Sequence, residues 1–106
     1  MIDPDDTNDL ATNVGRRLAL TRQALDLNQQ EFGTRAGLSQ PQYNQYENGA
    51  RLLTLRSAIK LCSEYDLTLD WLYRGDPGSL PYRLASRIKE LAAAQRSGQA
   101  DAGITS

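Results

Sequence analysis

Two helix-start signals follow one another near the middle of this chain, and they constrain its fold more than any other feature. Asn28 can cap a helix, and Glu31 stands three residues later, where it completes a capping box. Ser39 and Gln42 repeat this pattern for a second helix. Gly37 lies between them, where the end of the first helix needs a left-handed residue. The sequence therefore predicts two short helices joined by a tight turn.

Apolar residues at helical spacing predict four more helices around this pair. We expect them at about residues 12–25, 55–65, 69–74 and 80–91. The 55–65 helix is expected to turn four residues inward, and the last helix has an apolar stripe of its own. The inward residues are Leu55, Ala58, Ile59 and Cys62, and the stripe is Leu80, Leu84, Ile88 and Leu91.

These patterns indicate an all-α fold class, because no stretch shows the alternation typical of a strand. We divide the chain into four parts. Residues 1–10 are an acidic tail that lacks hydrophobic periodicity and is expected to be disordered, and residues 11–76 form the helix-turn-helix domain. Residues 77–97 are a C-terminal helix available for dimerisation, and residues 98–106 are a flexible tail.

Charge and cysteine content narrow the class of protein. The net charge is −1, but five of the 13 acidic residues lie in the end segments. The 12 basic residues all lie between Arg16 and Arg96 and face eight acids there, which leaves a mildly basic domain compatible with DNA. A single cysteine indicates a reducing, intracellular setting. No apolar run is long enough for a membrane span, and the acidic N-terminus is unlike a secretion signal.

The second helix of the pair, termed the reading helix, has one apolar side and one side rich in amides. Helical spacing places Tyr43, Tyr46 and Glu47 on the inward side. The outward side has no charged residue, and Asn or Gln can bond adenine N6 and N7 together in the major groove. We interpret this side as a base-reading surface in preference to an ordinary polar face. Its residues are Pro41, Asn44, Gln45 and Asn48, flanked by Gln40 and Gln42.

From Leu18 to Gly75 the chain resembles the Cro/C1-type (Xre-like) helix-turn-helix family. The resemblance rests on single residues and short motifs at a specific combined spacing. These are Leu18, Arg22, Leu27-Asn28-Gln29, Glu31-Phe32, Ala36-Gly37-Leu38-Ser39, Tyr43, Tyr46-Glu47-Asn48-Gly49 and Leu69-Asp70-Trp71-Leu72-Tyr73-Arg74-Gly75. The chain departs from the family pattern at Gly33 and Leu53, where alanine and proline are frequent. Neither position reads DNA, so these departures concern stability.

The resemblance implies a five-helix, lambda-repressor-like DNA-binding domain, usually dimeric and bound to a near-palindromic operator, to which this chain adds a C-terminal helix. It also implies that Gln29 contacts a phosphate and braces Gln40, and that Gln40, Pro41 and Gln45 face bases. Pro41 can make only apolar contact there, for example with a thymine methyl group. Asn48 and the loop that follows it match phosphate-contacting positions.

Residues outside the reading helix complete the predicted DNA-binding set. Asn28 belongs to it beside Gln29, and Arg51, just past the reading helix, is expected to neutralise a phosphate. Three further arginines fit a phosphate contact and plain solvent exposure equally well, and these are Arg16, Arg17 and Arg56.

Four residues outside the DNA-binding set are assigned to the interior. Arg22 and Glu47 are expected to form an inward-facing ion pair, because a charge on a core-facing side needs a partner. Cys62 is expected to be a buried, inert thiol. Trp71 is expected to lie in the core or in a dimer seam.

Together these features predict a sequence-specific regulator that binds double-stranded DNA, a homodimeric transcriptional repressor of a short palindromic operator. We expect a bacterial or phage protein in the cytoplasm, associated with the nucleoid, without cofactor, metal or membrane. The helices at about 69–74 and 80–91 are expected to form the dimer seam, since a single domain covers few base pairs. An enzyme is excluded because the chain lacks histidine, a metal-ligand cluster and a phosphate-binding loop. The alternative is an antitoxin-like protein whose main partner is a toxin and whose autorepression is secondary.

Overall fold

Six helical segments make up the part of the chain that the computed structural model describes, which is the backbone of residues 4–105 and the side chains of residues 10–96. They are α1 (Pro4–Ala24), α2 (Gln29–Arg35), α3 (Gln40–Glu47), α4 (Leu55–Tyr65), the π-helical turn η1 (Asp70–Arg74) and α5 (Tyr82–Thr105). Residues 4–105 contain no strand, so the predicted all-α fold class is confirmed. In those residues no helix combines the length and apolarity needed to cross a membrane.

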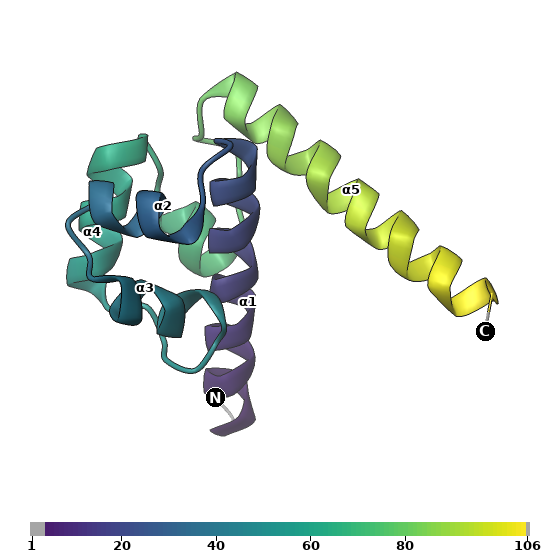
Figure 1. Ribbon diagram of the computed structural model, residues 1–106, viewed down its shortest axis with the longest axis horizontal. Helices are drawn as coiled ribbons and strands as arrows, with labels where there is room; N and C mark the ends of the chain where they lie inside the picture. Colours follow the sequence, from purple (N-terminus) through teal and green to yellow (C-terminus); the bar gives the residue numbers. More distant parts are fainter. Residues whose placement is uncertain (1–3, 106) are drawn as a thin grey trace.

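α1 runs through the middle of the molecule and connects its two sides. α2, α3 and α4 lie on one side of α1, and α5 starts near the end of α1 and leads away on the other side (Figure 1). The largest fully buried side chains come from five of the six elements, and each valine, leucine or phenylalanine among them contributes roughly 1.5–3 kcal/mol through its burial. They are Val14, Leu18 and Thr21 from α1, Phe32 from α2, Tyr43 and Tyr46 from α3, Leu61 from α4 and Leu72 from η1.

The helices end where the sequence supplies residues that tolerate a left-handed backbone. Gly37 has a φ of 82° and follows Ala36, the C-cap of α2, so that the chain turns and α3 can begin at Gln40. Asp26 and Asp66, with φ of 57° and 60°, stop α1 and α4 in the same way. Aspartate is one of the few residues with a side chain that enters this region at a modest cost.

α1 begins at Pro4, well before the expected start at about residue 12. Pro4 followed by Asp5 and Asp6 suits a first helical turn, because proline lacks only a donor that this turn does not use and acids favour the positive end of the helix dipole. Leu10 and Ala11 then continue the apolar side of the helix into the core. The structure therefore differs from the expected disordered tail over residues 4–10, while residues 1–3 lie outside the described residues.

α5 continues to Thr105, through most of the segment 98–106 that was expected to be a flexible tail. The alanines at 92–94 and the absence of proline favour an uninterrupted helix, and residue 106 lies outside the described part. The apolar stripe covers the domain of its own chain, because Leu84 and Ile88 are 8% and 3% exposed. Trp71 lies in the core, and its Nε1 donates to Thr21 Oγ1 at 2.9 Å. The division of the chain into four parts stays a prediction.

α4 turns a different side inward than expected. Leu55 and Ile59 are 58% and 51% exposed, so their predicted burial is wrong, whereas Ser57, Ala58 and Leu61 are buried. The buried Ser57 hydroxyl has a polar partner in α3, the hydroxyl of Tyr46 at 3.1 Å. Ala58 is buried as predicted. Apolar spacing could not reveal the polar partner of Ser57, so it selected Leu55 and Ile59 in place of Ser57 and Leu61. Cys62 is half-buried, and burial raises the pKa of its thiol, which disfavours the reactive thiolate.

Candidate nucleic-acid interface

α2 and α3 are each fixed at the start by a side-chain cap. The Asn28 side chain accepts from Glu31 N at 2.8 Å, and the Glu31 carboxylate accepts from Asn28 N at 3.1 Å, which completes the expected capping box. Ser39 Oγ accepts from Gln42 N at 3.3 Å and caps α3. Gly37 separates the two helices, so both caps act within one short helix-turn-helix.

Gly33 lets the two helices of the motif approach one another. A Cβ atom at this position would lie 2.9 Å from Cβ of Tyr43, closer than two side chains can pack. The Tyr43 ring fills the space instead and meets Phe32 edge-on, with ring centroids 5.3 Å apart. The departure from the family pattern at this position therefore has a local cause: a large, fully buried tyrosine opposite the glycine.

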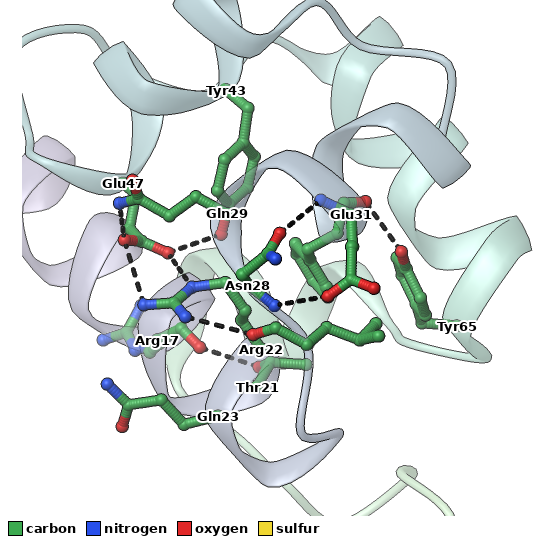
Figure 2. A network of polar contacts seen from close by, with 12 residues as sticks. Arg17, Thr21, Arg22, Gln23, Asn28, Gln29, Glu31, Tyr43, Glu47 and Tyr65 are labelled. Atoms are coloured by element: carbon green, nitrogen blue, oxygen red, sulfur yellow. Dashed lines mark hydrogen bonds and ion pairs between the residues drawn. The ribbon is translucent and has the colours of Figure 1, made fainter.

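Glu47 is the hub of the inward side of α3 (Figure 2). Its Oε1 lies 2.7 Å from Arg22 Nε and accepts from the Tyr43 hydroxyl at 2.7 Å. Its Oε2 accepts from the Gln29 side chain. Arg22 also donates to the carbonyl of Leu27 at 3.1 Å, which ties α1 to the loop before α2. The structure thus brings Arg22 and Glu47 together, with side chains only 17% and 8% exposed.

The charges of this hub stabilise one another. Burial alone would raise the pKa of Glu47, but hydrogen bonds from Arg22, Gln29 and Tyr43 outweigh it and hold this pKa below its usual value. For Arg22, burial works against the charged form, yet the Glu47 carboxylate raises its pKa. Burial and the neighbouring carboxylate raise the pKa of Tyr43 far above its usual value, so its hydroxyl stays a donor. The carboxylate and the guanidinium are therefore both charged at neutral pH.

Gln29 is engaged differently from what the resemblance implies. Its amide donates to Glu47, and no hydrogen bond to Gln40 is present among the described residues. The expected bracing of Gln40 is therefore not seen, because the carboxylate is a stronger acceptor than a neutral amide and lies within reach. A phosphate contact by Gln29 stays a prediction, as does one by Asn28, whose side chain caps α2.

Gln42 is turned toward the protein. Its Nε2 donates to the Tyr46 hydroxyl at 3.3 Å and to Ser57 Oγ at 3.4 Å, and the side chain is half-buried. The Tyr46 hydroxyl also lies 3.4 Å from Thr54 Oγ1. Gln42 therefore neither completes the expected capping box with its side chain nor offers its amide nitrogen to solvent, because two hydroxyl groups beneath α3 attract it.

The outward side of α3 is more varied than the sequence indicated. Gln40, Pro41 and Gln45 are exposed. Asn44 is half-buried, and its side-chain oxygen is buried without a hydrogen-bond partner among the described residues. Asn48 is exposed at the end of α3, and its side-chain oxygen accepts from Ala50 N at 3.0 Å. Gln40 and Gln45 are therefore the two amides of this helix that face solvent without a hydrogen bond in the described structure.

The arginines fall into different environments. Arg51 is exposed just after α3, and Arg56 is exposed on α4. Arg17 donates to the carbonyl of Leu72 at 3.0 Å and so satisfies a backbone acceptor in η1, whereas Arg16 donates to Asn13 at 2.9 Å. Arg17 thus has a structural role that its position in the sequence did not reveal.

Gly15 is a residue that the sequence reasoning missed. A Cβ atom there would lie 2.8 Å from the carbonyl oxygen of Tyr46 and would overlap that of Glu47. The backbone of α1 therefore touches the end of α3 directly at this glycine. The available signal was a glycine inside an apolar helical pattern, which marks a close approach when the helix continues through it.

Comparisons with known proteins agree with this architecture. The model of a helix-turn-helix family, of the Cro/C1 type, matches residues 18–72, more than half of the chain. No curated protein and no solved structure matches the chain.

Proposed function

Because this chain belongs to the Cro/C1-type helix-turn-helix family, whose members are DNA-binding transcription regulators, we propose that it is a homodimeric repressor of a short palindromic operator. One observation carries the proposal: Gln40 and Gln45 are exposed on a helix whose opposite side, at Tyr43 and Tyr46, is buried. A rigidly held helix with free amides is what bidentate recognition of a base edge requires.

Each residue of the interface has a proposed role. Gln40 and Gln45 read base edges, and Pro41 makes an apolar contact in the major groove. Phosphate contacts position the protein on the duplex and carry no sequence information. Asn28 and Gln29 make them at the start of α2, and Asn48 and Arg51 make them after α3.

A homodimer brings a second copy of α3 to the other half of the operator. One copy of α3 covers only a few base pairs, and two copies read half-sites spaced by about one helical turn, roughly 34–36 Å. In this role the protein acts in the cytoplasm, on the nucleoid, with no cofactor. Occupation of the operator by the dimer would exclude other proteins from the same DNA.

Selection of bound duplexes from a random library tests this proposal. The expected result is a palindromic consensus, with a stoichiometry of two chains per duplex. Equal recovery of all sequences would overturn it. If that outcome came with co-purification of a small toxin, the antitoxin-like alternative would replace the repressor.

A further inference from the structure

Side chains of α1 and α5, together with Trp71 of η1, line a groove. α5 itself lies on the opposite side of α1 from α2, α3 and α4 (Figure 1). The groove consists of two adjoining hollows of about 440 and 470 Å³ that share Leu20, Trp71, Ala92 and Arg96. Leu20 and Trp71 are each 6% exposed and form an apolar floor with Ala92. The groove lies away from the proposed DNA-reading side of α3, so it can be occupied while the protein is on DNA.

The rim of this groove is basic. Arg16 and Arg17 from α1 and Lys89 and Arg96 from α5 line it, and no lining residue is acidic. Among the described residues, none of these four cations forms an ion pair with a carboxylate. The pKa of Arg17 is lowered by burial and by the charge of Arg16 beside it, so an anion placed between them would relieve a repulsion. The groove is therefore suited to an acidic occupant with some apolar surface.

The chain contains a matching segment at its N-terminus. Residues 1–9 carry four aspartates and no basic residue, together with the apolar Met1 and Ile2. In its own chain the described part of this segment, residues 4–9, continues α1 away from the groove, because α1 is one helix from Pro4 to Ala24. A rise of about 1.5 Å per residue places position 9 roughly 10 Å from position 16 along this helix, and positions 4–8 lie farther away. A second copy, packed against α1 in the opposite direction, would bring this segment over the groove.

We infer that the groove between α1 and α5 binds the acidic N-terminal segment, residues 1–9, of a second copy, so that two copies exchange these segments. The inference rests on the homodimer of the proposed function. An antiparallel pair of α1 helices centred on Asn13, which lines the groove, brings position 9 of each copy opposite Arg17 of the other. Such an exchange is two-fold symmetric, as a closed dimer requires.

A charge-swap experiment on the full chain tests this inference. The groove variant carries Arg16→Glu with Arg96→Glu, and the tail variant carries Asp6→Lys with Asp9→Lys. Each variant alone sets like charges against one another in both exchanged contacts, whereas the mixture sets opposite charges together in both. We expect the dimer dissociation constant, measured by analytical ultracentrifugation, to rise about tenfold or more in each variant. The equimolar mixture is expected to form a 1:1 heterodimer.

Controls separate this inference from a general charge effect and from misfolding. Lys60→Glu with Arg83→Glu makes the same charge change at exposed positions outside the groove, and it should leave the dimer unchanged. Circular dichroism melting checks that each variant folds. The inference is overturned if either folded variant dimerises like the natural protein, or if the mixture fails to recover the dimer.

A monomeric natural chain at high micromolar concentration would also overturn this inference. The proposed function fails separately, by the lack of a consensus in the duplex selection. If a monomer selects a consensus, or if a dimer that survives the charge swap does so, DNA reading by α3 stands. The dimer contact would then lie outside this groove.

Discussion

The two sides of α3 differ in what their polar groups contact. On the inward side, the Glu47 carboxylate accepts from Arg22, Gln29 and Tyr43. On the outward side, the Gln40 and Gln45 side chains are exposed and make no hydrogen bond in the described structure. The helix is thus immobilised from behind while its front stays unoccupied. We expect the helix to bind without rearrangement, so that only the amide side chains lose freedom, which lowers the entropic cost of recognition.

Removal of the inward anchor is expected to have the largest effect. Glu47→Ala leaves the guanidinium of Arg22 half-buried without its carboxylate and deprives Tyr43 of its acceptor. The free energy of unfolding should fall by about 3–5 kcal/mol, as when one partner of a buried ion pair is removed. Chemical denaturation measures it, with the exposed Glu64→Ala as the control. A loss in Glu47→Ala no larger than in Glu64→Ala would show that the hub does not anchor α3.

The contacts of the Glu47 carboxylate also predict that the stability of the protein depends on pH. The pKa of Glu47 is lower in the folded protein than its usual value of about 4.3. Its contribution to stability is therefore complete above that value and is lost as the pH falls through the folded-state pKa. Denaturation of the natural protein and of Glu47→Gln should show a gap in stability at neutral pH that narrows below about pH 4. A gap that stays constant down to pH 3 contradicts a charged hub.

A smaller loss of stability is expected from a substitution at the point where α1 touches the end of α3. Gly15→Ala places a methyl group against the carbonyl groups of Tyr46 and Glu47, and the two helices must move apart. Helix propensity alone would make this change stabilising by roughly 1 kcal/mol. We expect a destabilisation of about 1–3 kcal/mol instead. Lys60→Ala, at an exposed position of α4, is the control for an added alanine. A rise in melting temperature for Gly15→Ala would rule out the close contact.

The smallest effect is expected from a substitution of Arg51, which follows α3 in the chain. Arg51→Ala removes one proposed phosphate contact, so the slope of log K against log salt should become shallower by about 0.9. The preferred operator sequence should stay the same, because a phosphate contact carries no base information. Titrations at several salt concentrations measure the slope, and Arg83→Ala on α5 provides a control. If the two variants give the same slope, Arg51 is a solvated arginine.

Local signals in the sequence were enough to predict the helix-turn-helix motif of α2 and α3. Asn28 and Ser39 cap α2 and α3 as predicted, since a cap and its target lie within three residues of one another. The pairing of Arg22 with Glu47 was also accessible, because two charges on core-facing sides need partners.

Contacts between distant segments were not accessible in this way. The orientation of Gln42 depends on Ser57 in α4, and the burial of Ser57 depends in turn on Tyr46 in α3. Apolar periodicity treats such a serine as exposed and the neighbouring Ile59 as buried, which is the reverse of what is found. Gly33 could be explained only once Tyr43 was seen opposite it.

Duplex selection repeated with two glutamine variants of α3 tests the contrast between its sides most directly. Gln45→Ala removes an exposed amide, whereas Gln42→Ala removes one that is bonded to Tyr46 and Ser57 beneath the helix. Gln45→Ala is expected to relax the base preference at one position in each half-site, a loss of about 1–3 kcal/mol of discrimination. Gln42→Ala should leave the consensus unchanged. The account is contradicted if Gln45→Ala retains the full consensus, or if Gln42→Ala is the variant that relaxes it.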